Sequence, residues 1–387
     1  MSSLAGLVSD ILNNGTAVYE MGMASNAIEK VVTDWLANQI GFGKNGSGFL
    51  TSGGTLANLT ALLAARKAKT TVWEKGNAKK LAVMVSEQAH YCIDRAARIL
   101  GMGDDGIIKI PVDAQYRMQT DSLEKHYQEA KAKGIQVIAV VSSSCSTSTG
   151  SYDNLNIIAD FCKKYELWLH VDGAHGGAVV VSQKYRHLVN GIERADSITI
   201  DFHKMLMTPT LNTALMFKNS ANSYKTFQQN AEYLWETTQS EEWFNSGKRT
   251  FECTKLMLST KIYAIIKMHG VEIFEQNVNH LYDKSRTFAV MIQEHVNFEL
   301  ALIPQANIVN FRYVNGEEII LNKLNTQIRQ QLLENGDFYI VQTIIQNKRY
   351  LRITVMNPLT TNEHFNKLLQ EIERIGKTLV RLVRINS

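Results

Sequence analysis

Two short apolar segments of this chain are each followed by polar side chains that could do chemistry. Residues 167–171 lead to the carboxylate of Asp172, and residues 197–200 precede the imidazole of His203 and the amine of Lys204. An amine in a polar pocket can form a Schiff base with an aldehyde, and a carboxylate can keep a pyridine nitrogen protonated. Pyridoxal phosphate (PLP) needs both groups from a protein. We therefore expect PLP to be joined to Lys204, with Asp172 at its ring nitrogen.

Each of these residues has an ordinary structural interpretation when it is taken alone. A lysine at the edge of a sheet is usually a solvated charge, and an aspartate after a strand commonly starts a turn. The combination of Asp172, His203 and Lys204 behind two apolar segments favours the cofactor site. Ala174 would then lie against one face of the PLP ring, where a small side chain leaves room.

A glycine-rich segment could hold the phosphate group of PLP. The sequence Thr-Ser-Gly-Gly-Thr ends at Thr55, which is expected to cap a helix over residues 56–69. Free backbone N–H groups and the dipole at a helix start can bind phosphate, and Gly54 lets the chain approach closely. A glycine pair before a helix is weak evidence by itself. Ser146 and His203 could supply further contacts to the phosphate.

A histidine after another apolar segment could complete the ring site. His90 follows the segment Val-Ser-Glu-Gln-Ala, and its flat imidazole could stack on the ring face opposite Ala174. Taken alone, His90 is better explained as a residue at a helix start that makes a local hydrogen bond.

The pattern of apolar segments predicts an α/β fold with a mostly parallel sheet. Apolar segments that alternate with helices are typical of sheets covered on both faces. In such sheets the chemistry lies at the carboxyl ends of the strands, which is where Ser146, Asp172 and Lys204 fall. Helices are expected near residues 90–100, 121–133 and 154–165, and strands at Leu81–Ser86, Ile107–Pro111, Val137–Ser142, Leu167–Asp172, Ser197–Ile200 and Thr213–Phe217.

The chain is expected to divide into three parts. Residues 1–40 form an N-terminal helical segment, residues 41–270 a large PLP-binding domain that opens with a glycine-rich loop, and residues 271–387 a small α+β domain. The polar and aromatic residues 218–254 lack periodicity and could be a mobile active-site loop. The strands expected in the small domain are Asn307–Tyr313, Asp337–Thr343 and Tyr350–Val355.

Composition excludes several classes of protein. The 387 residues are 45% hydrophobic and 20% charged, as in ordinary globular proteins. The net charge of +4 argues against a nucleic-acid surface. The apolar runs are all shorter than the roughly 18 residues of a membrane span, and the N-terminus does not resemble a secretion signal. The four scattered cysteines indicate no metal site and a reducing compartment, so we expect a cytoplasmic enzyme.

Ordered motifs along nearly the whole chain carry a resemblance to a known family. The sequence resembles the group II PLP-dependent amino-acid decarboxylases, which include glutamate, aromatic amino-acid, cysteine-sulfinate and 2,4-diaminobutyrate decarboxylases. The matching segments are Thr51–Asn58, Ser86–His90, Ser151–Asn154, His170–Asp172, Lys184–Leu188, Gly191–Ser197 and Asp201–Lys204. The resemblance implies a type I PLP-dependent transferase fold and a homodimer with the active site at its interface.

The resemblance adds two site residues that spacing alone does not indicate. Tyr233, in Ala-Glu-Tyr-Leu-Trp, matches a tyrosine of the family's mobile loop that protonates the substrate carbon after CO2 leaves. Arg352 matches an arginine that binds the substrate carboxylate in glutamate-type members. A packed aromatic residue and a surface arginine are the ordinary alternatives for the two.

Several departures from the family pattern bear on the site. The usual Gly-Thr-Thr stretch is Ser-Cys-Ser-Thr at residues 144–147, which weakens the role of Ser146, and His175 stands where an aromatic residue is common. Gly22-Met23 replaces a typical Ser-Pro. Family members also carry a longer N-terminal segment that lines the substrate pocket, and this chain begins within the helix after it. Either the protein is naturally short or the sequence is incomplete, and this difference bears on substrate binding and on activity.

These features together predict the decarboxylation of an L-amino acid to an amine and CO2. Arg352 and the overall similarity favour an acidic substrate or 2,4-diaminobutyrate. The alternatives are another PLP enzyme, such as an aminotransferase or a lyase, and a homologue that binds the cofactor with little activity.

Overall fold

The computed structural model describes residues 2–76, 79–227 and 242–385. The chain divides into two compact units. The first contains residues 1–147 and 152–278, and the second contains residues 148–151 and 279–387.

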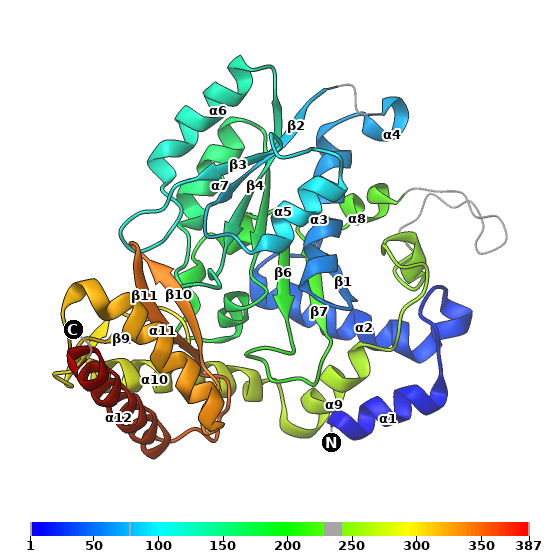
Figure 1. Ribbon diagram of the computed structural model, residues 1–387. Coiled ribbons are helices and arrows are strands. Elements are labelled where there is room, and N and C mark those ends of the chain that lie inside the picture. Colours follow the sequence, from blue (N-terminus) through cyan, green and yellow to red (C-terminus); the bar gives the residue numbers. More distant parts are fainter. Residues whose placement is uncertain (1, 77–78, 228–241, 386–387) are drawn as a thin grey trace. The chain divides into compact units, whose positions relative to one another are not determined.

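The first unit is built on a sheet of seven strands in the order β1-β7-β6-β5-β4-β2-β3 (Figure 1). Strands β2 to β6 are parallel, whereas β7 runs antiparallel to both of its neighbours. Every residue of β2, β5, β6 and β7 is buried, which explains why these strands read as continuous apolar runs. The strands are β1 (Ser47–Thr51), β2 (Leu81–Ser86), β3 (Ile107–Ile110), β4 (Gln136–Ser143), β5 (Trp168–Asp172), β6 (Ser197–Asp201) and β7 (Thr213–Phe217).

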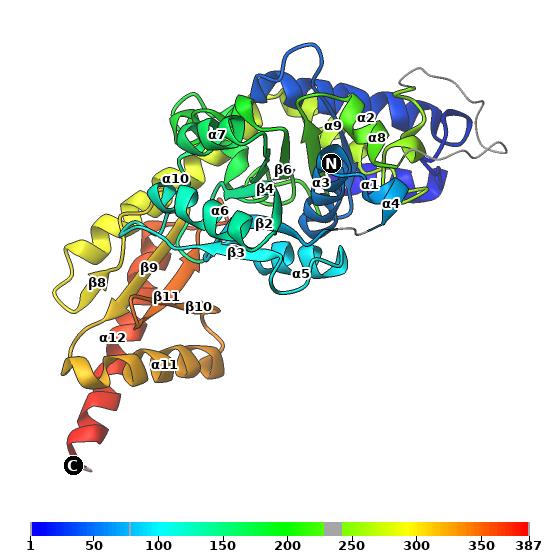
Figure 2. The same cartoon turned by 90° about the horizontal axis from the view of Figure 1, so that it is seen from above.

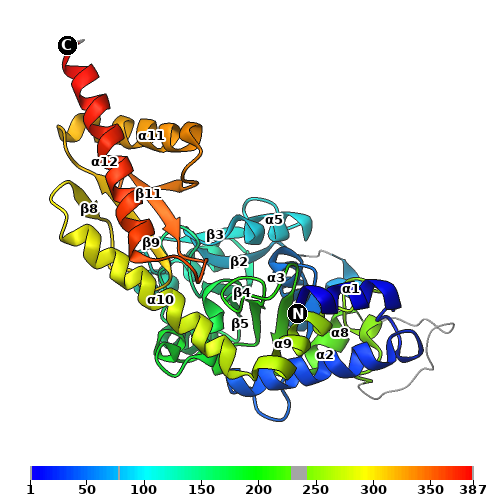
Figure 3. The same ribbon diagram turned by 90° about the horizontal axis from the view of Figure 1, so that it is seen from below.

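Helices of the first unit pack on this sheet and on one another. The alanine- and leucine-rich helix α3 contacts strands β4 to β7 and buries Ala57, Ala61 and Leu62 in the main core. Helices α1 and α2 both lie beside α9 (Figure 3). The helices are α1 (Ser2–Leu12), α2 (Tyr19–Ile40), α3 (Gly54–Lys69), α4 (Val72–Lys75), α5 (Tyr91–Ile99), α6 (Leu123–Ala132), α7 (Leu155–Lys164), α8 (Ala221–Thr226) and α9 (Ser259–His269).

The second unit is an antiparallel sheet with helices packed against it (Figure 2). Its strand order is β10-β11-β9-β8, and α11 and α12 contact both each other and the sheet. Helix α10 (Glu272–Gln293) begins in the first unit and continues into the second. The remaining elements are β8 (Phe298–Leu300), β9 (Ile308–Tyr313), α11 (Glu318–Asn335), β10 (Val341–Ile345), β11 (Lys348–Thr354) and α12 (Asn362–Ile385).

The predicted strands of the first unit are confirmed to within two residues, but the glycine-rich segment was interpreted wrongly. Residues 47–51 form β1 rather than a loop, because each of them pairs with a residue of β7. Helix α3 begins at Gly54 and follows Gly53, whose φ is 138°, so the prediction that Thr55 caps it is wrong. Thr55 lies inside the first turn instead.

Other parts of the chain agree with the predicted secondary structure only in part. The helical segment expected over residues 1–40 consists of two helices, which residues 13–18 separate. The strand expected at 337–343 lies later, at Val341–Ile345, and the short strand β8 was not foreseen. Part of the polar segment 218–254 is helical in α8, while residues 228–241 lie outside the described part of the chain.

Candidate active site

A cavity of about 500 Å³ lies in the first unit where β4, β5 and β6 end. Loops after the carboxyl ends of parallel strands meet at this edge, as expected for an open α/β sheet. Eight predicted site residues line it: Gly54, Thr55, His90, Ser146, Asp172, Ala174, His203 and Lys204. Chain segments up to 150 residues apart in sequence thus converge on one cavity.

The remaining two predicted site residues are placed differently. Tyr233 lies outside the described residues. Arg352 lies on β11 of the second unit, where its register partners are Val341 and Asn310.

Lys204 forms an ion pair with a carboxylate that the sequence analysis did not single out. Its Nζ is 2.8 Å from Oδ2 of Asp201, the last residue of β6, and the Asp201 side chain is only 2% exposed. Burial alone would lower the pKa of Lys204, but the attraction and hydrogen bond of Asp201 outweigh it, so this pKa is raised. Asp172 adds to the same effect from further away. The amine is therefore held as an ammonium group at neutral pH.

Asp172 is a buried carboxylate at the end of β5. Its Oδ1 accepts a hydrogen bond of 3.2 Å from the backbone N–H of Ala174. Burial raises the pKa of Asp172, and the positive charge of Lys204 offsets this only in part. A protonated nitrogen placed beside Asp172 would stabilise its ionised form, which fits the pyridine nitrogen of PLP.

His90 makes a local hydrogen bond and also lines the cavity. It is the cap of α5, and its Nδ1 accepts a hydrogen bond of 3.3 Å from the backbone N–H of Cys92. The same side chain lines the cavity. Burial lowers the pKa of His90, with Asp172 opposing that shift and Lys204 adding to it. A neutral imidazole fixed in this way offers a flat surface for a ring to stack on.

The start of α3 offers a place for a phosphate group. A Cβ atom added to Gly54 would lie 3.5 Å from the Cβ of Ala174 and 3.4 Å from Oδ1 of Asp201. Backbone N–H groups of a first helical turn, together with the helix dipole, favour an anion. His203 is anchored nearby, because the backbone N–H of Asn212 donates to its Nδ1 at 3.1 Å. The lysine, the buried acid, the flat imidazole and the helix start together fit PLP.

Asp201 shows where the sequence interpretation fell short. It stands beside the motif residues His203 and Lys204, yet only its neighbours were given roles. The signal was the alternation of buried polar residues along β6, because Ser197, Thr199 and Asp201 share one face of the strand.

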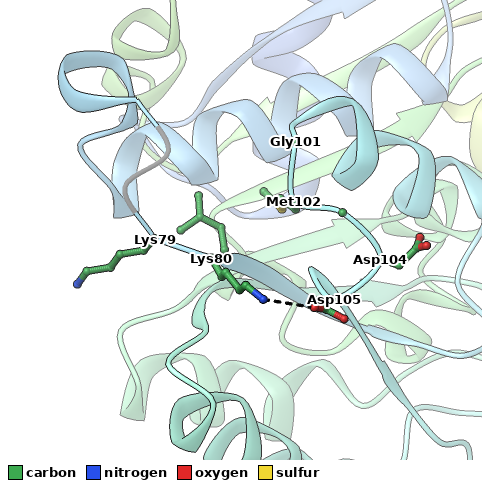
Figure 4. A pocket seen from close by; sticks show the side chains of 8 residues that line it. Lys79, Lys80, Gly101, Met102, Asp104 and Asp105 are labelled. Atoms are coloured by element: carbon green, nitrogen blue, oxygen red, sulfur yellow. Dashed lines mark ion pairs between the residues drawn. The ribbon is translucent and has the colours of Figure 1, made fainter.

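A second hollow, of about 640 Å³, is lined by a different set of residues (Figure 4). Lys79 extends away from it, and Lys80 lies 3.6 Å from Asp105 in an exposed ion pair. The residues that line this hollow include no buried reactive side chain, so we assign no catalytic role to it. Within the described ranges, the His, Cys, Asp and Glu side chains form no cluster of three that could hold a metal ion. The described helices also include none long and apolar enough to cross a membrane.

Comparison with known proteins agrees with this geometry. The pyridoxal-dependent decarboxylase conserved domain matches residues 1–314. The chain belongs to the pyridoxal-dependent decarboxylase family. It is accordingly a PLP-dependent amino-acid decarboxylase, which is a carboxy-lyase, and the predicted family, fold and cofactor are confirmed.

Curated relatives act on different amino acids. An L-2,4-diaminobutyrate decarboxylase of Acinetobacter baumannii is 30% identical over 96% of this chain and 76% of its own length. An aromatic-L-amino-acid decarboxylase of Bacillus atrophaeus is 29% identical over 97% of this chain and 79% of its own. The near-equal identities leave the substrate unassigned.

Solved structures share the fold. The glutamate decarboxylase domain of a diaminobutyrate-pyruvate transaminase and L-2,4-diaminobutyrate decarboxylase from Vibrio parahaemolyticus matches with a TM-score of 0.85 and 26% identity, covering 97% of this chain and 78% of that one. Mouse CSAD matches with a TM-score of 0.90 and 25% identity, covering 97% of this chain and 81% of that one.

Proposed function

We propose that this decarboxylase acts on a small L-amino acid that is acidic or resembles 2,4-diaminobutyrate, with PLP joined to Lys204. The observation that carries the proposed cofactor site is the convergence of Lys204, Asp172 and His90 on one cavity. The relatives include an acidic amino acid decarboxylase of Bos taurus and an aspartate 1-decarboxylase of Aliivibrio fischeri, beside the aromatic-L-amino-acid decarboxylase of Bacillus atrophaeus.

Each residue around the cavity has a distinct task in this proposal. Bound PLP supplies an electron sink for the charge left on the substrate carbon when CO2 departs. The amine of Lys204 binds the cofactor, and the carboxylate of Asp172 keeps its ring nitrogen protonated. The imidazole of His90 covers one face of the ring, and Ala174 leaves room on the other.

The phosphate group is assigned to the start of α3. Backbone N–H groups of Gly54 and Thr55 would bind it, with Ser146 and His203 as further donors. All four residues line the same cavity as Lys204. A Cβ at position 54 would meet Ala174 and Asp201 at ordinary contact distances.

Two further roles come from the family resemblance. Tyr233 would donate a proton to the substrate carbon after CO2 leaves, as a phenol acting as a general acid. Arg352 would bind the substrate carboxylate, for which its planar, forked guanidinium is suited.

We also propose that two copies of the chain associate and that the enzyme is cytoplasmic. Helix α1 exposes an apolar stripe at helical spacing, made by Leu4, Leu7, Val8 and Ile11, which are each more than half exposed. A second copy that covered this stripe would remove it from water. The four free cysteines suit a reducing compartment.

The test is product analysis on a panel of amino acids. Purified protein supplied with PLP should release CO2 and the matching amine from aspartate, glutamate or 2,4-diaminobutyrate faster than from aromatic amino acids. A keto acid formed without CO2 would instead identify an aminotransferase. Faster turnover of an aromatic amino acid would overturn the proposed substrate class.

A further inference from the structure

We propose that Asp201 is a positioning residue for Lys204: its buried carboxylate holds the ε-ammonium group whenever the amine is not joined to the cofactor. The inference rests on the proposed role of Lys204 as the cofactor-binding lysine. It assigns the second carboxylate of the cavity a task separate from that of Asp172.

The carboxylate of Asp201 is fixed on both of its oxygen atoms. Thr213, its register partner on β7, donates a hydrogen bond of 2.5 Å to Oδ1. The other oxygen, Oδ2, lies 2.8 Å from Nζ of Lys204. The hydrogen bond from Thr213 on the neighbouring strand fixes Oδ1, and this orients Oδ2 toward the lysine.

The ion pair of Lys204 is with Asp201 rather than with Asp172. Asp201 precedes Lys204 by three residues, and its side chain is 2% exposed, whereas the side chain of Lys204 is 37% exposed, so water reaches the pair from the side of the lysine. Asp172 acts on the lysine only from beyond ion-pair distance. The structure thereby keeps the two carboxylates apart in function: Asp201 faces the amine, and Asp172 stays available for the heterocycle.

Other charged or polar groups also face this pair. From the β6–β7 connection, Nε2 of His203 lies 3.6 Å from Oδ2 of Asp201. His90, Asp172 and Cys145 act electrostatically on the pair from the ends of neighbouring elements. Among these groups Asp201 makes the direct contact with the ammonium, so its removal should have the largest effect on Lys204.

The role predicts that the lysine becomes easier to deprotonate once the carboxylate is neutralised. An adjacent opposite charge shifts a pKa by roughly one unit or more. In Asp201→Asn, the pH at which Lys204 is half deprotonated should therefore fall by at least about one unit. At a fixed pH below that midpoint, the amine should react about tenfold faster with an acylating reagent.

The experiment is acetylation of the PLP-free protein with acetic anhydride over a range of pH, with mass spectrometry of the peptide that carries Lys204. A matched pair of variants, Thr213→Val and Thr213→Ser, controls for local disturbance. The valine variant should shift the midpoint in the same direction by less than Asp201→Asn does, and the serine variant should behave as wild type. Far-UV circular dichroism checks that each variant folds.

An unchanged midpoint in folded Asp201→Asn would overturn the positioning role. If that variant fails to fold, equal midpoints for the two Thr213 variants would overturn it instead. Cofactor attachment is read separately, by borohydride reduction. If PLP is attached at Lys204 but the midpoint in Asp201→Asn does not shift, only the positioning role is wrong. If the midpoint shifts but PLP is not attached at Lys204, only the assignment of Lys204 as the cofactor lysine is wrong.

Discussion

Two buried charged groups, Arg312 in the second unit and Asp172 in the first, are partnered differently. In the second unit Arg312 is 1% exposed, and its guanidinium is paired with both Glu299 and Glu318 at 3.1 and 2.9 Å. In the first unit Asp172 is also buried, yet its hydrogen-bond donor is the backbone N–H of Ala174. A buried ion is costly unless it is paired. Arg312 therefore supports the fold of the second unit, and the incompletely compensated carboxylate of Asp172 is consistent with the cofactor role proposed for it.

The pKa values follow the same division. Burial raises the pKa of Asp172, and its neighbours do not reverse the shift. Burial also acts to raise the pKa of Glu299, but the hydrogen bond and charge of Arg312 overcome it, so this pKa is lowered. Of these two carboxyl groups, only that of Asp172, which lines the cavity, keeps a pKa raised by burial.

The largest effect should come from Lys204→Ala. Without the amine the protein loses its covalent link to PLP, so turnover should fall to background and the imine absorbance should disappear. Absorbance spectra and CO2 release measure the two effects. A variant that kept the imine spectrum would show that another lysine binds the cofactor.

Asp172→Asn should lower activity while stabilising the PLP-free fold at neutral pH. Turnover should fall roughly 100-fold, because the ring nitrogen loses its acidic partner. A carboxyl group whose pKa is raised on folding contributes stability at low pH and loses it as pH rises through that pKa. The gain in Tm of the variant over wild type should therefore shrink as the pH is lowered toward 4 (roughly the ordinary pKa of an aspartate). A gain that did not depend on pH would contradict the burial argument.

A substitution of Arg312 in the second unit should lower stability and leave activity nearly unchanged, which is the opposite of the effect expected for Asp172→Asn. Arg312→Met should lower the free energy of unfolding by about 2 kcal/mol, less than for a fully buried pair because water can reach the two glutamates. Turnover per folded molecule should remain within about twofold of wild type, since a 0.4 kcal/mol change in barrier is about a factor of two. Urea unfolding and CO2 release test the two statements.

A matched control for that variant is Arg374→Met in the same unit. Arg374 is exposed and pairs with Glu371 three residues earlier, so its loss should cost less than about 0.5 kcal/mol. Equal destabilisation by the two substitutions would remove the distinction between them.

The sequence predicts local patterns and strand ends well. Strands β2 and β7 are found at their predicted bounds. Asp172 and Lys204 lie at one edge of the sheet because Asp172 ends β5 and Lys204 follows β6, and these strands are adjacent and parallel. Strand β1 was missed because only Phe49 and Leu50 interrupt its polar and glycine residues, and its stability comes from pairing with the distant β7. Local periodicity cannot show such a partner.

The interaction partners of the site residues could not be predicted from the sequence either. Lys204 was recognised by its type and position, but its pairing with Asp201 depends on Thr213, which fixes the carboxylate from a strand that follows a turn. For the same reason, the ordinary and the functional interpretations of His90 looked exclusive in sequence, although its Nδ1 is used locally while its ring lines the cavity.

The most direct test of the account is borohydride reduction of the PLP-loaded protein, followed by mass spectrometry of its peptides. Reduction fixes PLP permanently to the amine that holds it. The account predicts one modified peptide, with the added mass on Lys204. Modification of a different lysine, or no modification at all, would contradict the assignment on which the site depends.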